Sequence, residues 1–319
     1  LLVDPAGDLW IGTWNGLNLR RAANGAIERW HSAAGDALAG HQVGSLNLLA
    51  DGRIGVATTH RGAFLIGNDR TSLRAIELPV NGEWSWADPE VGGLLQPRPD
   101  EIWIAGYRGI VVIDAATLGV RQYLRRDVSI ASSLSVSHVE TMLKDRSGNL
   151  WLGGFGGGLQ RHDPANQSVR VVHHSPTRAG GLSNPSVGGV LELSNGEIWI
   201  GTRGNGVDIL DRQRGVVAAV RASATGGVLS SGIVSSLAQT ADGSVWVGTV
   251  AGLNRVDAAS HARMEVEVPA ALTEANVRRL LPGQQGDLWI GSNIGLAHWS
   301  PQDQRIALLS AGGDDVLAG

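Results

Sequence analysis

The sequence predicts an all-β fold, a seven-bladed β-propeller built from four-stranded antiparallel blades. Two observations carry this prediction. A short tryptophan-centred motif returns along the whole of the 319 residues, and each period contains several short apolar runs separated by glycine-rich turns. A fixed period of this size indicates one supersecondary unit copied many times. Four strands in a unit of about 45 residues are the signature of a propeller blade.

The fullest copy of the motif begins at Asp145 and reads Asp-Arg-Ser-Gly-Asn-Leu-Trp-Leu-Gly-Gly, followed shortly by Gly-Leu-Gln-Arg. Five other copies also hold a tryptophan in an apolar triplet, and Gly55 stands at that position in a degenerate seventh copy. The motif centres are residues 10, 55, 103, 151, 199, 246 and 289, with steps of 45, 48, 48, 48, 47 and 43 residues. This near-constant step places one blade in each period.

Within one repeat, four segments have the composition of β-strands. In the fullest copy they are an apolar run at 139–143, the tryptophan strand, a run after Gly158 and an outer run at 168–172. Turn-forming Asp, Asn and Gly separate these runs. The Asp-x-x-Gly turn should join the first two strands, with Asp capping its own backbone and Gly supplying a positive φ. No long stretch shows helical periodicity, so we expect few helices.

The motif tryptophans are expected to lie between blades. Twisted sheets splay apart as they radiate, and a large flat ring fills the wedge. Ile198 and Ile200 should then face the opposite side of their sheet from Trp199. The glycine after the triplet gives room where blades crowd near the axis. A lead-in leucine such as Leu134 should pack between adjacent blades, whereas blade 2, with Gly55 in place of tryptophan, should pack less well.

The repeat overrides the two-domain organisation that the length alone would suggest, because a propeller is one closed domain. We therefore expect residues 1–319 to form a single domain. The chain starts inside a repeat, and its tail resembles the lead-in to another repeat, so we expect it to be an excerpt of a longer protein. The expected blades span about 1–32, from 42 onward, 91–128, 137–175, 186–222, 233–268 and 276–309.

Composition excludes several classes of function. The net charge is −4, with 26 basic and 30 acidic residues, which argues against a nucleic-acid partner because such a partner needs a clustered basic face. The chain has no cysteine, which rules out disulfides, cysteine nucleophiles and thiolate metal sites. Its single lysine, Lys144, lies beside a repeat turn, which argues against Schiff-base chemistry. No apolar run is long enough to span a membrane, so this segment should not contact one.

The repeat D-x-x-G-x-L-W-I-G-T-x-x-G-L-x-R resembles the two-component regulator propeller repeat, and the resemblance covers the whole chain. Proteins with this repeat are typically large bacterial membrane receptors. Their exported propellers sense a ligand, often an oligosaccharide, and signal to a cytoplasmic histidine kinase or diguanylate cyclase. The resemblance implies a small-molecule or oligosaccharide ligand, a location on the periplasmic or extracellular side of the inner membrane, and a homodimer formed through the full receptor.

Propellers bind ligands on the face that carries the turns between second and third strands and the blade-to-blade connections. Aromatic, arginine and asparagine side chains there suit a sugar, because rings stack on its apolar faces while polar groups fix its hydroxyls or a uronate. The predicted ligand-binding residues are Trp14, Asn15, His60, Arg61, Trp84, Trp86, Tyr107, Arg108, Phe155, Arg203, Asn205 and Asn293. His41, His138 and Asn276 lie in connections of the same face. The asparagines also have an ordinary interpretation as turn residues.

We expect no catalytic residue, metal or cofactor in this segment, because the sequence has no nucleophile elbow, phosphate-binding loop or His-Glu-x-x-His motif. Two alternatives stay open. The first is a propeller enzyme that acts on a glycan or on a cyclic peptide; the streptogramin lyases are such propellers. It would need an axial carboxylate or histidine, and the candidate histidines are His60, His41 and His138. A protein-interaction scaffold would instead present a dry apolar patch on a blade edge.

Overall fold

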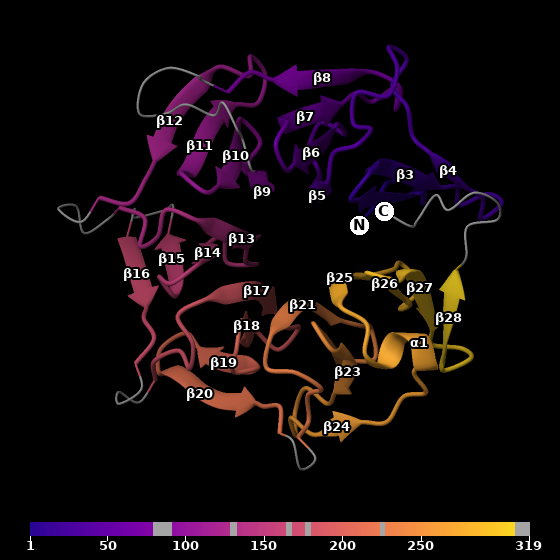
Figure 1. The fold of residues 1–319 in the computed structure, drawn as a ribbon. Coiled ribbons are helices and arrows are strands. Elements are labelled where there is room, and N and C mark those ends of the chain that lie inside the picture. The colour runs from indigo at the N-terminus through magenta and orange to yellow at the C-terminus, as the bar shows by residue number, and fades with distance from the viewer. Residues whose placement is uncertain (79–90, 128–132, 164–167, 176–179, 224–226, 310–319) are drawn as a thin grey trace.

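Seven four-stranded antiparallel sheets are arranged in a ring around a central axis (Figure 1). The computed structural model describes residues 1–78, 91–127, 133–163, 168–175, 180–223 and 227–309. The predicted seven-bladed propeller of four-stranded antiparallel blades is thereby confirmed. Each blade is a meander whose strands follow one another in chain order from the axis to the rim.

The first four blades occupy the N-terminal half of the chain, and each strand is short. Blade 1 contains β1 (Leu2–Val3), β2 (Leu9–Thr13), β3 (Gly16–Arg20) and β4 (Ile27–Arg29). Blade 2 contains β5 (Val43–Leu48), β6 (Ile54–Thr58), β7 (Gly62–Ile66) and β8 (Leu73–Ile76). Blade 3 contains β9 (Val91–Arg98), β10 (Glu101–Gly106), β11 (Gly109–Asp114) and β12 (Val120–Leu124). Blade 4 contains β13 (Val139–Lys144), β14 (Leu150–Gly154), β15 (Leu159–Asp163) and β16 (Ser168–Val172).

The remaining three blades complete the ring. Blade 5 contains β17 (Val187–Glu192), β18 (Ile198–Thr202), β19 (Val207–Asp211) and β20 (Gly215–Val220). Blade 6 contains β21 (Val234–Gln239), β22 (Val245–Thr249), β23 (Gly252–Val256) and β24 (Arg263–Met264). Blade 7 contains β25 (Val277–Pro282), β26 (Leu288–Ser292), β27 (Gly295–Ser300) and β28 (Arg305–Leu309). The one helix among the described residues, α1 (Ala270–Thr273), is short, and none there is long and apolar enough to cross a membrane.

The hydrophobic core is divided among the interfaces between blades, as the motif predicts. Trp199 is fully buried and belongs to one cluster with Val245 and Val247 of the next blade. Trp246 packs in the same way against Leu288 and Ile290. The lead-in leucines lie in these interfaces as well, which confirms their predicted role; they are Leu38, Leu134, Leu182 and Leu229. Each tryptophan therefore joins its own blade to the following one.

The indole N–H groups of the motif tryptophans in blades 1, 3, 4, 5 and 6 are satisfied from one of two positions in the repeat. In blades 1 and 4 the Asp of the Asp-x-x-Gly turn accepts the indole hydrogen bond, with Trp151 Nε1 lying 2.8 Å from Asp145 Oδ2. The same carboxylate caps its own turn by accepting from the Asn149 backbone N–H at 2.8 Å. Blades 3 and 5 lack that Asp, and a glutamate two residues before the tryptophan takes its place; Glu197 accepts from Trp199 at 3.3 Å. The indole N–H of each of these five tryptophans therefore has a hydrogen-bond partner, as is usual for buried polar groups.

The glycine that follows the tryptophan triplet permits the close approach of the next blade. A Cβ built on Gly201 would lie 2.6 Å from Cγ1 of Val234, the first residue of the next innermost strand. Gly153 and Gly248 have the same relation to Val187 and Val277, at 2.7 Å. This confirms the expected crowding near the axis in these blades, whereas blades 2 and 3 hold alanine at the same position, at Ala57 and Ala105.

Blade 2 was expected to pack less well because Gly55 replaces the tryptophan. The structure shows a different outcome, since Leu94 of blade 3 occupies the space over the glycine. A Cβ on Gly55 would lie 2.7 Å from Leu94 Cδ2. Leu94 is buried in a cluster with Leu65 and Ile104. The missing ring is therefore replaced by a side chain of the neighbouring blade, and the interface is filled.

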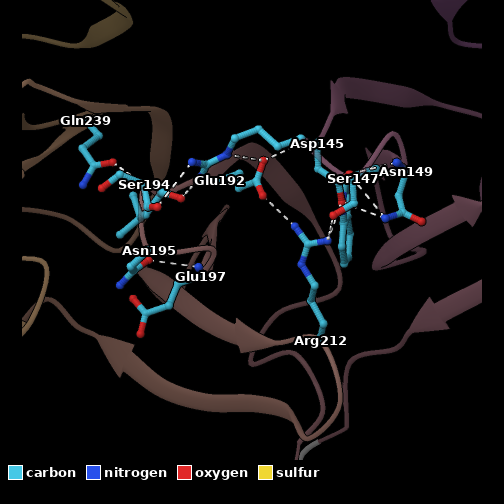
Figure 2. Close-up of polar contacts among 12 residues, drawn as sticks. Asp145, Ser147, Asn149, Glu192, Ser194, Asn195, Glu197, Arg212 and Gln239 are labelled. Carbon is cyan, nitrogen blue, oxygen red and sulfur yellow. Dashed lines mark hydrogen bonds and ion pairs between the residues drawn. The ribbon is translucent and has the colours of Figure 1, made fainter.

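The face that carries the Asp-x-x-Gly turns is cross-linked from blade to blade. Figure 2 shows this network between blades 4 and 5. Arg212 Nη1 lies 3.0 Å from Asp145 Oδ2, and its Nη2 lies 2.7 Å from Glu192 Oε1. The network of hydrogen bonds continues from blade 5 to blade 6, because the Ser194 backbone N–H donates to Oε1 of Gln239 in β21 at 2.7 Å. Charged groups on this face are therefore paired with one another, which gives the turns a structural role.

Candidate functional site

A β-bulge in the innermost strand shapes the axis of the ring. In six blades the pairing register shifts just after the first residue of this strand, a valine, so that one extra residue bulges out. Bulges re-aim side chains and are common next to binding sites. The bulged residues are Gly44, Gly92, Glu140, Gly188, Ser235 and Arg278, and all six line one axial cavity.

The axial cavity has a volume of about 510 Å³. It exists because four of the six bulged residues are glycine or serine and place little bulk at the axis. A Cβ built on Gly44 would meet no atom within 4 Å, so the cavity is open at that point. The cavity size lies in the range of sites for small-molecule ligands. The innermost strands β5, β9, β13, β17, β21 and β25 surround this region of the ring (Figure 1).

One side of the cavity rim is formed by a row of contacting side chains, three rings from blades 3 and 4 and a guanidinium from blade 5. The ring of Tyr107 packs against that of His138 at a tilt of 33°, with centroids 3.8 Å apart, and His138 stacks on Phe155 at 5.5 Å. The guanidinium of Arg203 lies over Phe155 at 5.3 Å. Arg203 also forms an ion pair with Glu140, whose other carboxylate oxygen lies 3.4 Å from His138 Nε2. The positive charge of Arg203 is therefore balanced on this side.

The other side of the rim is formed by blades 7 and 1 and has a different charge. The guanidinium of Arg278 lies 5.0 Å from the ring centroid of Trp14. Arg279 is the next residue of β25 and lines the same cavity. Desolvation by the surrounding protein lowers the pKa of Arg279, although the residue is classed as exposed by its accessible surface. Arginine stays protonated in proteins, so this side of the cavity is cationic.

Exposed aromatic side chains gather on this face. Trp14 and Tyr107 are each 49% exposed and Phe155 is 50% exposed. Ile233 and Ile294 are exposed on the same face, in a blade connection and a turn. Large exposed apolar groups that cluster usually mark a binding surface.

The structure brings some of the predicted residues together at the cavity and leaves others away from it. The predicted residues that line the cavity are Trp14, Tyr107, Arg203 and Asn293, with His138 and Asn276 from the connections. Phe155 joins them through its contacts with His138 and Arg203. Asn15, His60, Arg61, Arg108, Asn205 and His41 are outside the lining. Trp84 and Trp86 lie outside the described residues.

The three predicted asparagines attach turns to neighbouring connections. Asn15 Oδ1 accepts from the Gly40 backbone N–H at 2.8 Å, and Asn293 Oδ1 accepts from the Asn276 backbone N–H at 2.7 Å. Asn205 Nδ2 donates to the Ser183 backbone carbonyl at 3.2 Å. These side chains hold the loops of the face in place, and their role toward a ligand stays a prediction.

Sequence reasoning missed the charged residues of the innermost strands, Glu140, Arg278 and Arg279. A signal was present, because the dipeptide after the first valine of each innermost strand can be aligned across six repeats. It reads Gly-Ser, Gly-Gly, Glu-Thr, Gly-Gly, Ser-Ser and Arg-Arg. The glycine and serine dipeptides predict an open cavity at the axis. The charged dipeptides of blades 4 and 7 would then mark the part of the cavity that contacts a ligand.

A second cavity of about 660 Å³ lies between blades 3 and 4. Its lining combines apolar residues such as Trp103 with Tyr123 and His162. Desolvation lowers the pKa of His162 and raises the pKa of Tyr123. Lys144 lies in this lining, with Nζ donating to the Pro97 carbonyl at 2.6 Å. This cavity lies between sheets, whereas the axial one opens among the turns and connections that the repeat leaves variable.

No group of three or more histidine and acidic side chains that could hold a metal occurs within the part of the chain that the structure describes. The three histidines named as enzyme candidates are also separated. His138 lines the cavity, whereas His41 and His60 do not.

Comparison with known proteins identifies the repeat. A family model described as a two-component regulator propeller matches residues 181–204 and 228–251, which hold the first two strands of blades 5 and 6. The chain carries the two-component regulator propeller repeat. This confirms the resemblance noted from the motif. No curated protein sequence gives a match.

Solved structures share the propeller fold. The extracellular domain of a protein assigned to the hybrid two-component systems of B. thetaiotaomicron matches with a TM-score of 0.56 and 18% identity, covering 98% of this chain and 49% of that one. PorZ, a surface component of the type-IX secretion system of Porphyromonas gingivalis, matches at 0.66 and 16%, covering 95% and 46%. The chain thus spans about half the length of both. Inactive virginiamycin B lyase of Staphylococcus aureus with quinupristin matches at 0.64 and 14%, covering 88% of each chain.

Proposed function

We propose that this propeller is the ligand-sensing module of a bacterial membrane signalling receptor, on the periplasmic or extracellular side, and that it binds an oligosaccharide at its axial face. Two findings support the sensory part of the proposal. The chain carries the two-component regulator propeller repeat, and it shares its fold with the extracellular domain of a hybrid two-component system. The ligand and its site are argued from the geometry of the axial face.

The observation that carries the proposal is the axial cavity with exposed aromatic rings at its rim. Sugars present apolar faces to aromatic rings and hydroxyl groups to polar side chains. Trp14 and Tyr107 line the cavity from blades 1 and 3, and each is about half exposed. Arg203 and Asn293 supply polar groups from blades 5 and 7. Few convergent polar groups in a preformed concave site are typical of ligand pockets.

Binding at the axis gives the ligand contact with several blades at once. The cavity lining contains residues of all seven blades, from Trp14 in blade 1 to Asn293 in blade 7. A ligand held there binds the closed ring and loses its contacts when the ring opens. It therefore stabilises the folded state by an amount that grows with concentration, about 2.7 kcal/mol at one hundred times the dissociation constant.

A thermal-shift screen tests the proposal. The protein is heated with each member of a panel of neutral, acidic and sulfated oligosaccharides, and Trp14→Ala and Tyr107→Ala are run beside the parent. Leu308→Ala is the matched control, since Leu308 is similarly exposed on the outer strand β28. We expect a higher melting temperature with one glycan class, a reduced shift in both axial variants and the parental shift in the control. A panel without any shift, or a shift that both axial variants keep, would contradict the proposal.

The samples from the thermal-shift screen also test the alternative that the protein is an enzyme. His138 and Glu140 are close enough to exchange a proton, with 3.4 Å between Nε2 and Oε1, and both line the cavity. Mass spectrometry of the glycan after incubation should show the intact oligosaccharide if the module only senses it. A product that disappears in Glu140→Gln would instead identify an enzyme.

A further inference from the structure

The axial cavity carries positive charge that the described residues leave unbalanced. Its ionised lining residues among the described ones are Arg203, Arg278, Arg279 and Glu140. Arg203 and Glu140 pair with each other. Within the described residues, Arg279 forms no hydrogen bond or ion pair, and the recorded contact of Arg278 is with the ring of Trp14. Two neighbouring guanidinium groups therefore face the cavity without an acidic partner in the described part of the chain.

The strand geometry explains how both arginines reach the axis. Successive residues of a regular strand point to opposite faces of the sheet. In β25, however, Val277 pairs with Ser292 and Arg279 pairs with Gly291, so Arg278 is the extra residue of the bulge. The bulge turns the strand at this point, and both side chains line the cavity. A regular strand would have placed only one of them there.

The position of the pair in the ring separates it from the one acidic side chain of the described lining. Glu140 occupies the bulge of β13 in blade 4, and Figure 1 shows β13 across the axis from β25 of blade 7. The bulges between them on either side hold only glycine or serine, at Gly188 and Ser235 and at Gly44 and Gly92. No protein carboxylate within the described part of the site can neutralise the arginines.

We propose that Arg278 and Arg279 form an anion subsite, which recognises a carboxylate or sulfate carried by the sugar ring next to Trp14. The inference rests on the proposed function, since it names the class of oligosaccharide. A guanidinium group has a planar fork of donors that matches a carboxylate or sulfate in two parallel hydrogen bonds. The ligand is therefore an acidic oligosaccharide.

Paired probes separate charge from sugar recognition. Trigalacturonate is compared with its fully methyl-esterified form, which keeps the rings and removes the negative charges. A singly sulfated galactose disaccharide is compared with its desulfated form in the same way, so that the two arms distinguish carboxylate from sulfate. Binding to the intact protein is measured by calorimetry at low salt and at physiological salt.

We expect one charged probe to bind at least about tenfold more tightly than its neutral partner, a difference that corresponds to about 1.4 kcal/mol. This preference should shrink at higher salt because ions screen exposed charges. Arg279→Gln and Arg278→Gln should each abolish most of it, whereas Arg279→Lys should retain part. Arg214→Gln, which removes an exposed arginine paired with Asp211 at the outer edge of blade 5, is the charge-matched control and should bind as the parent does.

Three results would overturn the inference. Equal binding of a charged probe and its neutral partner would leave the sensor proposal intact and remove the anion subsite. A preference for charge that survives in both glutamine variants would place the anion elsewhere. Failure of all four probes, with a neutral glycan giving the shift in the wider screen, would show a sugar site without anion recognition. Failure of every glycan would instead contradict the proposed function itself.

Discussion

The two faces of the ring treat charge in opposite ways. On the face of the Asp-x-x-Gly turns, Arg212 bridges two carboxylates and every member of the network in Figure 2 has a partner. On the axial face, Arg278 and Arg279 line a cavity without an acidic partner among the described residues. Within the described residues, these two guanidinium groups add nothing to the polar network that joins the blades. The difference indicates that one face holds the ring together and the other is adapted to a ligand.

The strongest expected contrast concerns two tryptophans. Trp199 is fully buried between blades 5 and 6, so Trp199→Ala should lower the free energy of unfolding by about 3–5 kcal/mol. Trp14 is half exposed on the axial face, and Trp14→Ala should change stability by no more than about 0.5 kcal/mol while weakening ligand binding. Thermal unfolding and glycan titration of both variants check this. Equal destabilisation by the two substitutions would contradict the distinction between tryptophans that hold the blades together and tryptophans that bind the ligand.

Glycines offer the second contrast. Gly201→Ala forces a Cβ to within 2.6 Å of Val234 Cγ1, and overpacking of this kind costs about 1–3 kcal/mol. A Cβ on Gly44 meets no atom within 4 Å, so Gly44→Ala should be tolerated. The larger Gly44→Leu should fill part of the axial cavity and reduce binding without lowering the melting temperature much. A strongly destabilised Gly44→Ala variant would show that the cavity is not open in solution.

Arginines test the charge comparison directly. Arg212→Ala leaves the buried carboxylate of Asp145 with fewer partners, and we expect a loss of about 1–3 kcal/mol in stability. Arg279→Ala removes a charge that has no acidic partner among the described residues, and stability should stay within about 0.5 kcal/mol of the parent or rise. Melting temperatures in the absence of glycan measure both. A large destabilisation by Arg279→Ala would reveal a structural role and weaken the case for an anion subsite.

The smallest expected effect is a dependence of stability on pH. Burial alone would raise the pKa of Asp145, but hydrogen bonds from Trp151 and Asn149 and the charge of Arg212 outweigh burial and hold it below its ordinary value. The unfolded chain, with an Asp pKa of about 3.9, then binds the proton more readily, so this stabilisation is complete above about pH 5 and is lost as pH falls below 4. Thermal unfolding from pH 6 to pH 2 should therefore show a declining midpoint.

The variant Asp145→Asn should show a smaller decline over this range than the parent. The control is Asp303→Asn, which changes an exposed aspartate on the outer edge of blade 7. The control should follow the parental curve. Identical acid profiles for parent and Asp145→Asn would mean that this carboxylate is not one of the groups whose protonation unfolds the ring.

The number of blades and the packing between them could be predicted from the sequence because the motif that forms them repeats. The spacing of the tryptophans set the number of blades, and burial of residues such as Trp10 and Trp246 follows from their place in the motif. The packing that fills the place of the missing tryptophan in blade 2 could not be predicted, because it depends on Leu94 of another repeat lying over Gly55. Contacts between different repeats carry no periodic signal in one sequence.

The site was predictable only in part, for a related reason. The turns that carry Trp14 and Tyr107 interrupt the motif visibly, so these residues could be selected as variable positions. Arg278 and Arg279 lie inside a strand, where simple alternation would direct only one toward the axis. The bulge that exposes both is a property of backbone pairing and appears only in the structure.

A crystal structure of the protein soaked with trigalacturonate tests the central claim most directly. The account predicts density for the sugar in the axial cavity beside Trp14, with a carboxylate within hydrogen-bonding distance of the guanidinium of Arg279. Density in the cleft between blades 3 and 4 beside Tyr123, or among the Asp-x-x-Gly turns around Arg212, with only solvent at the axis, would contradict it.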